Sequence, residues 1–238
     1  MKNIRVCLFI LFSVVFLILS NGTTANAMQT GFETSELSSK EKNNFISNID
    51  FSLILDEPDK KGVICFDVND QGMIAVGQND FERKNICVYT SEGEFMYGYT
   101  FNCEQNFGLE FDGSNVNVCF VRSDVVVSLD TEGNILDVKK IQDSIDNSSY
   151  RTALLYSTTR TVGDTTYLIR NDMGILNWIA ISFSQIVIVD ATGAETVIYD
   201  VNSMQLTKMI VAISLICVLV FFAVAVIIRQ FIKLRHVN

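Results

Sequence analysis

One segment near the C-terminus limits the possible folds of this chain more than any other feature. It is an apolar run of 20 residues without a charge, Met209–Ile228. A helix of this length spans about 30 Å, which matches the hydrocarbon core of a bilayer. We therefore predict a transmembrane helix at residues 208–228 that contacts the lipid bilayer through Met209–Ile228, with a buried core helix as the alternative.

A second, shorter apolar segment lies at the N-terminus. It runs from Val6 to Leu19 behind two basic residues, and the small residues Ala25-Asn26-Ala27 come after it. The run is too short to cross a bilayer comfortably, and this order of basic, apolar and small residues is typical of a signal peptide. We predict a signal peptide at residues 1–27, with an uncleaved signal anchor as the alternative.

The distribution of charge predicts the orientation in the membrane. Basic residues follow the long apolar run, so residues 229–238 are predicted to form a short basic cytoplasmic tail and the N-terminal domain to lie outside the cell membrane. All 27 acidic residues lie between Met28 and Thr207 with only 12 basic ones, a net charge of −15 for this segment. Because such a surface repels phosphate backbones, we expect no nucleic-acid partner.

The outer part of the chain has two regions. Residues 28–50 are polar with a helix-compatible stretch at Glu36–Ile46, and we interpret them as a flexible lead-in or short surface helix. Residues 51–207 contain short runs of β-branched and aromatic residues between turn residues, which predicts strands joined as an antiparallel meander. The predicted strands are Phe51–Leu55, Gly62–Asp67, Met73–Gln78, Asn85–Thr90, Phe95–Phe101, Leu109–Phe111, Val116–Arg122, Val125–Leu129, Ile135–Ile141, Arg151–Tyr156, Thr165–Ile169, Gln185–Val189 and Thr196–Tyr199.

Three places in this region share one sequence pattern. Each is a strand, a polar turn that ends in Gly93, Gly133 or Gly193, and a second strand. The first two glycines are 40 residues apart, about the length of a four-stranded unit. An insertion, Asn171–Ser182, lengthens the third unit and contains the only tryptophan, Trp178. The pattern predicts about three repeated antiparallel units.

These units resemble the repeats of six-bladed β-propellers of the NHL and related types, whose blades often read as strand, Asp-x-x-Gly, strand. The resemblance covers Gly62–Asp200 and implies an all-β extracytoplasmic domain of propeller-like sheets. Three units are too few for a closed ring, which takes at least four. Four alternatives are open: a partial propeller, a curved stack in which Phe51–Leu55 completes the last sheet, a homodimer that supplies six blades, and a two-sheet β-sandwich. In a monomer, Phe51–Leu55 or the insertion would cover the open edge.

Histidine is missing from the outer region, because the only one is His236 in the predicted tail. Without an imidazole, neither a Ser-His-Asp or Cys-His pair nor a His-containing zinc site can form there. Paired carboxylates could still hydrolyse glycosidic bonds, and the candidates are Asp67, Glu110, Asp112 and Asp130. Most of them lie at repeat turns, where Asp stabilises the turn, so we favour that interpretation and predict no catalytic residue.

One loop is a candidate metal site. Asp67, Asn69 and Gln71 stand before Gly72 with the spacing that begins an EF-hand calcium loop. The twelfth position is Gln78, where such a loop needs a bidentate Glu, and a strand follows instead of a helix. We predict no cofactor and keep the first three residues as calcium candidates.

Cysteines and aromatic residues supply the remaining candidates. Cys65, Cys87, Cys103 and Cys119 lie outside the membrane-directed segments and form either disulfides or buried free thiols. The aromatic residues of Phe95–Phe101 alternate, so a period of two sends all four to one face, which favours a core role. If that face looks outward, Tyr97 and Tyr99 offer a ligand face, and Trp178 is a further candidate.

The missing catalytic groups, the short tail and the fold class favour a non-enzymatic function. We expect a membrane-anchored extracytoplasmic binding or interaction module, such as an accessory subunit of a cell-envelope or transport complex. Its protein partner is not identified by the sequence. A carboxylate-dependent carbohydrate-active enzyme is the alternative.

Overall fold

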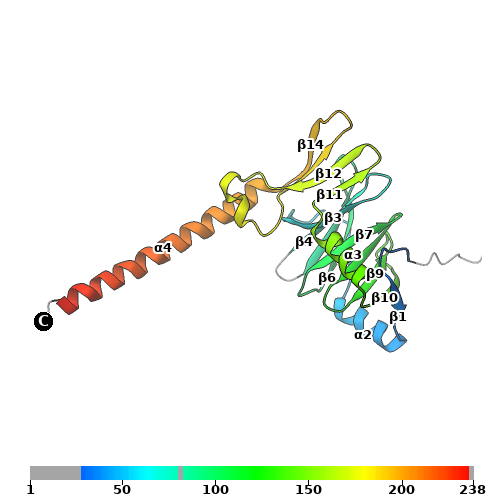
Figure 1. Ribbon diagram of the computed structural model, residues 1–238, viewed down its shortest axis with the longest axis horizontal. Helices are drawn as coiled ribbons and strands as arrows, with labels where there is room; N and C mark the ends of the chain where they lie inside the picture. The colour runs from blue at the N-terminus through cyan, green and yellow to red at the C-terminus, as the bar shows by residue number, and fades with distance from the viewer. Residues whose placement is uncertain (1–27, 80–82, 236–238) are drawn as a thin grey trace, which may run out of the picture.

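The computed structural model of the protein describes residues 28–79 and 83–235, so the predicted signal peptide and His236 lie outside the described residues. Within these ranges the chain forms three antiparallel sheets, two short α-helices beside them, and one long C-terminal helix that projects away (Figure 1). The prediction of a mainly β domain followed by an apolar helix is confirmed. We refer to residues 28–201 as the β-domain.

Each sheet contains four consecutive strands that pair as a meander, as the short connections predict. The first sheet, in the order β2-β6-β5-β4-β3, contains β2 (Ser52–Ile54), β3 (Val63–Val68), β4 (Ile74–Asn79), β5 (Lys84–Tyr89) and β6 (Phe95–Phe101). The second, β1-β10-β9-β8-β7, contains β1 (Thr34–Glu36), β7 (Phe107–Asp112), β8 (Asn115–Phe120), β9 (Val125–Leu129) and β10 (Ile135–Ile141). The third contains β11 (Thr159–Val162), β12 (Thr165–Arg170), β13 (Gln185–Val189) and β14 (Glu195–Asp200) in that order.

The turn between the last two strands of each meander has the same geometry in all three sheets. Gly93, Gly133 and Gly193 have φ angles of 84°, 83° and 83°. Each glycine donates its N–H to the carbonyl oxygen three residues earlier, at 3.0, 3.1 and 2.9 Å. Glycine reaches this φ without the strain that a side chain would cause. The repeated sequence pattern therefore marks three equivalent turns.

Two apolar layers hold the sheets together, and the first sheet lies between them. One layer joins it to the second sheet through residues such as Val88, Phe101 and Val127. The other joins it to the third sheet through residues such as Phe66 and Ile186. Because both faces of the first sheet are buried, its central strands contain apolar residues at successive positions instead of strict alternation.

Strand β6 departs from the predicted alternation at one residue. A β-bulge shifts the register, so that Val88 pairs with Tyr97 while Tyr89 pairs with Phe95. Met96 is the extra residue, and Phe95 packs in the opposite apolar layer with its ring centroid 5.9 Å from that of Tyr89. The prediction that Phe95 shares a face with the three following aromatic residues is wrong, because a bulge breaks the period of two.

The segment Arg151–Tyr156, predicted as a strand, is the second half of helix α3 (Ile145–Tyr156). Ser144 caps this helix by accepting the backbone N–H of Asn147 at 3.1 Å. Tyr150 and Leu154 lie four residues apart on one helix face and pack with the second sheet. The cap at Ser144 and the spacing of Tyr150 and Leu154 favour a helix over a strand here.

Residues 28–50 are part of the β-domain and not a separate lead-in. Strand β1, which the sequence did not predict because it is polar, pairs with β10. The predicted surface helix is present as α2 (Ser39–Ile49) and begins with a capping box between Ser38 and Glu41. Met28, Phe32 and Ile49 are buried, so this segment adds to the core.

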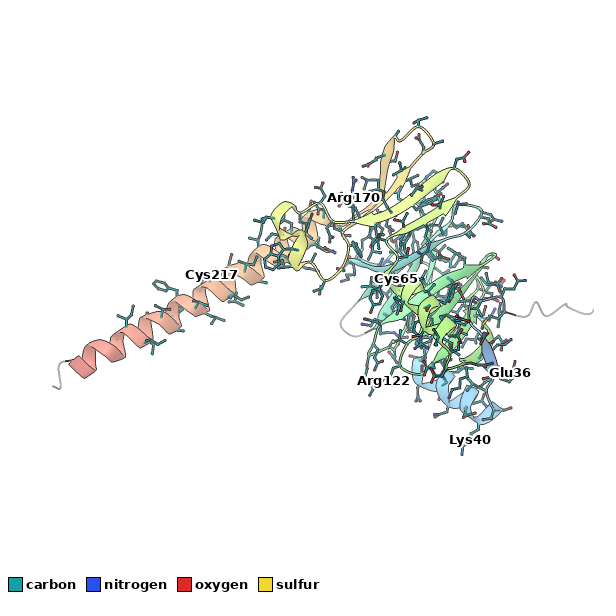
Figure 2. The ribbon with its side chains drawn as sticks, in the orientation of Figure 1. Glu36, Lys40, Cys65, Arg122, Arg170 and Cys217 are labelled. Atoms are coloured by element: carbon teal, nitrogen blue, oxygen red, sulfur yellow. The ribbon has the colours of Figure 1, made fainter. Side chains whose placement is uncertain are left out.

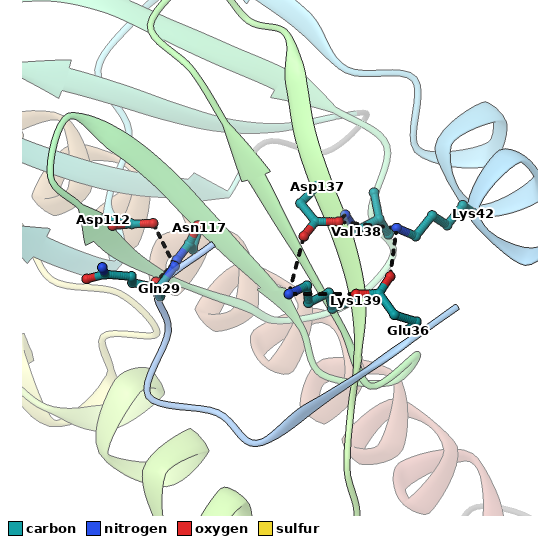
Figure 3. Close-up of polar contacts among 8 residues, drawn as sticks. All are labelled: Gln29, Glu36, Lys42, Asp112, Asn117, Asp137, Val138 and Lys139. Atoms are coloured by element: carbon teal, nitrogen blue, oxygen red, sulfur yellow. Dashed lines mark hydrogen bonds and ion pairs between the residues drawn. The ribbon is translucent and has the colours of Figure 1, made fainter. Parts of the chain in front are cut away.

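An ion-pair network fastens α2 to the second sheet. Lys42 lies 3.2 Å from both Glu36 and Asp137, and Lys139 lies 3.5 Å from Asp137 (Figure 3). Burial raises the pKa of Asp137, but hydrogen bonds from Lys42 and from the backbone of Val138 outweigh it and hold the pKa below its ordinary value. The carboxylate of Asp137 is therefore stabilised in its charged form.

The sheet edges differ from the prediction in one respect. Strand β2 pairs with β6 at the outer edge of the first sheet, so Phe51–Leu55 does not complete the last sheet. In the described part of the chain, the first and second sheets each gain a short outer strand, β2 or β1, whereas β14 forms the outer edge of the third sheet. The homodimer stays a prediction. Phe32 and α3 pack on the face of the second sheet that points away from the first sheet, where a second copy would have to join to continue a ring.

Replacing the buried Asn147 by alanine should lower the free energy of unfolding by about 2–4 kcal/mol, because it leaves buried backbone groups unpaired. Asn147 accepts the N–H of Glu33 at 2.8 Å and donates to the carbonyl oxygens of Glu33 and Gln142 at 2.9 and 2.7 Å. Urea unfolding followed by circular dichroism measures the change. Ser149→Ala, an exposed position in the same helix, is the control, and equal effects of both substitutions would contradict the prediction.

The C-terminal helix α4 (Asn202–Arg235) follows β14 after a single intervening residue, Val201. Residues Asn202–Arg229 are long and apolar enough to cross a membrane, and none of the most apolar part is buried against the protein. This finding is consistent with the predicted membrane anchor. The helix is longer than the predicted transmembrane segment at residues 208–228, because it starts six residues before Lys208.

Candidate functional site

Asp67, the first calcium candidate, lies on β3 and connects the three sheets. One carboxylate oxygen accepts the Nε hydrogen of Arg160 on β11 at 2.7 Å, and the other accepts the backbone N–H of Phe111 on β7 at 2.8 Å. The guanidinium of Arg160 also lies 5.4 Å from the ring centroid of Phe66. Both oxygens are therefore engaged by the protein itself.

The other two calcium candidates are not directed toward Asp67. Asn69 accepts the N–H groups of Gln71 and Met73 at 3.1 and 2.9 Å and donates to the carbonyl of Gly113 at 3.0 Å. The side chain of Gln71 is exposed. Within residues 28–79 and 83–235, no three His, Cys, Asp or Glu side chains are grouped so that they could hold a metal ion.

Glu110 and Asp112 lie on β7 and hold the N-terminal segment on the second sheet. The two carboxylate oxygens of the buried Glu110 accept the hydroxyl groups of Thr30 and Tyr150. Asp112 accepts the backbone N–H of Gln29 at 2.8 Å, and the side chain of Asn117 donates to the carbonyl of Gln29 at 2.7 Å (Figure 3). These contacts assign both carboxylates a structural role.

Asp130 lies apart from these carboxylates, in the turn between β9 and β10. Its side chain accepts the backbone N–H groups of Glu132 and Asn134 at 2.9 and 2.8 Å. This is the turn role that the sequence favours for such residues. Asp190 accepts the equivalent N–H groups of Thr192 and Ala194 in the third sheet, at 2.8 and 2.9 Å.

The three aromatic ligand candidates do not come together. Tyr97 and Tyr99 are buried in the layer between the first and second sheets, where the hydroxyl of Tyr99 donates to the carbonyl of Asp130 at 2.7 Å. They face the core and form no outward surface. Trp178 lies on the short 3₁₀ helix η1 (Gly174–Ile179) and is exposed.

The four cysteines of the β-domain are free thiols. Cys65, Cys87 and Cys119 are buried and Cys103 is half-buried. Figure 2 shows Cys65 inside the β-domain and Cys217 on the projecting helix. Burial raises the pKa of Cys87 and of Cys119 to about 12, and it raises that of Cys65 still further. A thiol with such a pKa is a poor nucleophile at neutral pH.

The full chain in vesicles should therefore react with a membrane-impermeant maleimide first at Cys103. At pH 8 each of the three buried thiols should react at least about a thousandfold more slowly than Cys103, because almost none of it is ionised and the protein covers it. Peptide mass mapping measures the order, and Cys103→Ser should remove the fast phase. Labelling of these cysteines only after a reducing agent is added would instead indicate disulfides.

A cleft of about 590 Å³ lies where the β-domain joins α4. Four separate parts of the chain line it: the residues around the start of β3, the first residue of β5, the residues at and after the end of η1, and the first turns of α4. Its lining includes Lys61, Ile64, Ile179, Ile181, Met204 and Lys208. Met209, the first residue of the apolar run, also reaches it, so the cleft opens beside the predicted membrane-spanning part of the helix.

Hydrogen bonds fix the base of α4 to the walls of this cleft. Gln205 donates to the hydroxyl of Ser182 at 3.1 Å and to the carbonyl of Phe183 at 3.2 Å. Gly62 lies against both, since a Cβ there would be 2.1 Å from Ser182 Oγ and 2.2 Å from Gln205 Nε2. The β-domain is thus joined to the helix by direct contacts and not by a flexible linker.

Comparisons with family models, with curated proteins and with solved structures all find no match. The interpretation of the site therefore depends on the geometry alone.

The cleft was not predicted from the sequence, because the residues that line it lie up to 148 positions apart in the chain, from Lys61 to Met209. The one indication of this site in the sequence was the insertion Asn171–Ser182. Its isoleucines and single tryptophan lie in a loop between two strands, where exposed polar residues are the rule.

Proposed function

We propose that this protein is a membrane-anchored extracytoplasmic interaction module whose β-domain binds a second membrane protein at the cleft beside α4. One observation carries the proposal: the β-domain is fastened to the base of the helix, and the cleft is formed between them. An occupant of this cleft must reach the membrane surface, because Met209 contributes to its wall. A protein in the same membrane meets that requirement.

We also propose that the three sheets are blades of a partial propeller. Strand β3 contacts both β7 and β11, so the first strand of the first meander lies against the first strands of the other two, as expected at the centre of a propeller. The orientation proposal is that the β-domain lies outside the cell and the basic end of α4 in the cytoplasm. Both support a role in which the sheets act as a rigid scaffold and the cleft binds the partner.

The side chains that line the cleft favour a partner segment that lies close to the membrane and carries some acidic residues. The cleft combines apolar side chains such as Ile64, Ile179 and Met204 with the positive charges of lysines, among them Lys208. Apolar contacts at the centre with charges at the rim are typical of protein interfaces. The proposed partner thus presents apolar side chains flanked by carboxylates.

Photocrosslinking in native membranes tests this function. A photoreactive phenylalanine derivative at Ala180, in the cleft wall, should give one discrete adduct with an integral membrane protein. The same derivative at Tyr156, an exposed position on α3, is the matched control and should not give that adduct. An Ile179→Asp variant should lower the Ala180 adduct about tenfold, because it places a charge in an apolar contact.

Two results would overturn the proposed function. One is the same adduct pattern from Ala180 and from Tyr156. The other is an Ala180 adduct that Ile179→Asp does not reduce, since such an adduct would not depend on the cleft.

A further inference from the structure

Three large apolar side chains are concentrated on the insertion between β12 and β13. Ile175, Trp178 and Ile181 are 84%, 80% and 96% exposed. Single exposed apolar residues are normal on soluble proteins, but a group of them within seven residues marks an interaction surface. We call these three side chains the insertion surface.

The insertion is held in one conformation by its own polar contacts. Asn177 accepts the N–H of Met173 at 2.8 Å and donates to the carbonyl of Asn171 at 3.2 Å. The side chain of Asn171 in turn accepts the N–H of Ser184 at 2.8 Å. Met173 is buried, so the segment is also anchored by an apolar contact. The insertion surface therefore has a defined position relative to the sheets.

That position is beside the first turns of α4, which lead into the apolar run. Asn202, in the first turn of the helix, donates to the carbonyl of Asp172 at 2.6 Å. Residues Ile179 and Ile181 line the same cleft as Lys208 and Met209. Figure 1 shows the segment before β13 beside the first turns of α4. If α4 crosses a bilayer, the insertion surface lies at the boundary between headgroups and acyl chains.

We propose that Ile175, Trp178 and Ile181 insert into the interfacial region of the leaflet that faces the β-domain, with membrane lipid as their partner. The position of the insertion identifies lipid as the occupant, because Ile181 lines the same cleft as Met209, and the exposed apolar residues Ile210 and Val211 follow Met209 directly on the helix. Tryptophan prefers the level where apolar chains meet polar headgroups. Lys208 supplies a positive charge at that level.

This contact gives the β-domain a second attachment to the membrane. One helix alone allows the domain to rotate and tilt, whereas a helix and a neighbouring insertion restrict both motions. The cleft would then open at a constant height above the bilayer. The inference depends on α4 crossing a membrane, but not on a protein in the cleft.

The single tryptophan allows a direct test with the full chain in phosphatidylcholine vesicles. Lipids brominated near the top of the acyl chains, at carbons 6 and 7, should quench the emission of Trp178 about twofold relative to unbrominated lipid. Aqueous iodide should quench it little. The double variant Trp178→Phe/Tyr156→Trp moves the probe to an exposed site on α3, where iodide should quench and brominated lipid should not.

A second variant separates lipid contact from a change of fold. Ile175→Ser/Ile181→Ser alters only exposed side chains, so the circular dichroism spectrum should stay unchanged while quenching by brominated lipid falls by about half. Strong iodide quenching of Trp178 without bromolipid quenching would overturn the proposal. Protection of Trp178 from both quenchers would also overturn it, because protein and not lipid would then cover the surface.

Discussion

Replacing Gly93 by alanine should lower the free energy of unfolding by about 3 kcal/mol, the sum of a backbone term and a steric term. Gly93 has a φ of 84°, which costs an alanine about 1 kcal/mol. In addition, a Cβ at this position would lie 2.5 Å from the carbonyl oxygen of Ile198 in β14. Because that oxygen belongs to the backbone of the third sheet, relief of the clash requires the sheets to separate.

Gly193→Ala is a matched control for this variant. Gly193 occupies the same turn of the third sheet with a φ of 83°, but a Cβ there would meet no atom within 4 Å. It should therefore cost only the backbone term, about 1 kcal/mol. Denaturant unfolding of the full chain in mild detergent measures both values. Equal costs at the two positions would mean that the contact between Gly93 and β14 does not stabilise the fold.

Replacing Asp67 by alanine should also lower the free energy of unfolding by about 3 kcal/mol. The side chains of Asp67 and Arg160 are mostly buried, at 16% and 18% exposure, so the substitution leaves an uncompensated positive charge away from water. It also leaves the backbone N–H of Phe111 without its acceptor. Both losses occur where the three sheets meet.

Asp70→Ala is the control, because Asp70 is exposed in the adjoining turn and should change stability by less than about 0.5 kcal/mol. Calcium distinguishes the two roles considered for Asp67. If the loop binds Ca²⁺, added Ca²⁺ should raise the melting temperature of the wild type but not that of Asp67→Ala. If Asp67 serves only the ion pair, Ca²⁺ should change neither. A small effect of Asp67→Ala would contradict the structural role.

Local patterns in the sequence predicted most of the secondary structure. Runs of β-branched and aromatic residues identified most of the strands, and β6, β9, β10 and β13 agree with the prediction in both bounds. The three Gly-containing turns were also found, because a positive φ selects glycine wherever it occurs. The failures have specific causes. In β6 a bulge moved Phe95 to the other layer, and in Arg151–Tyr156 an upstream cap produced a helix.

The candidate sites were predicted less well than the strands. Asp67, Glu110 and Asp112 were identified as chemically interesting, but their partners Arg160, Tyr150 and Gln29 lie 93, 40 and 83 residues away in the chain. No local pattern relates such residues. Their hydrogen bonds show that these carboxylates join the sheets to each other and to the N-terminal segment.

The sequence by itself determined the properties that depend on neighbours along the chain: the apolar helix, the antiparallel meanders and the turns between their strands. Hydrophobicity, backbone preference and short connections act within a few residues, so they can be recognised there. Only the tertiary structure decided which sheet lies in the middle, that β2 joins the first sheet, and that the insertion with Trp178 lies at the base of α4. These arrangements arise from packing between residues far apart in sequence, where many pairings are possible until side chains fill the same space.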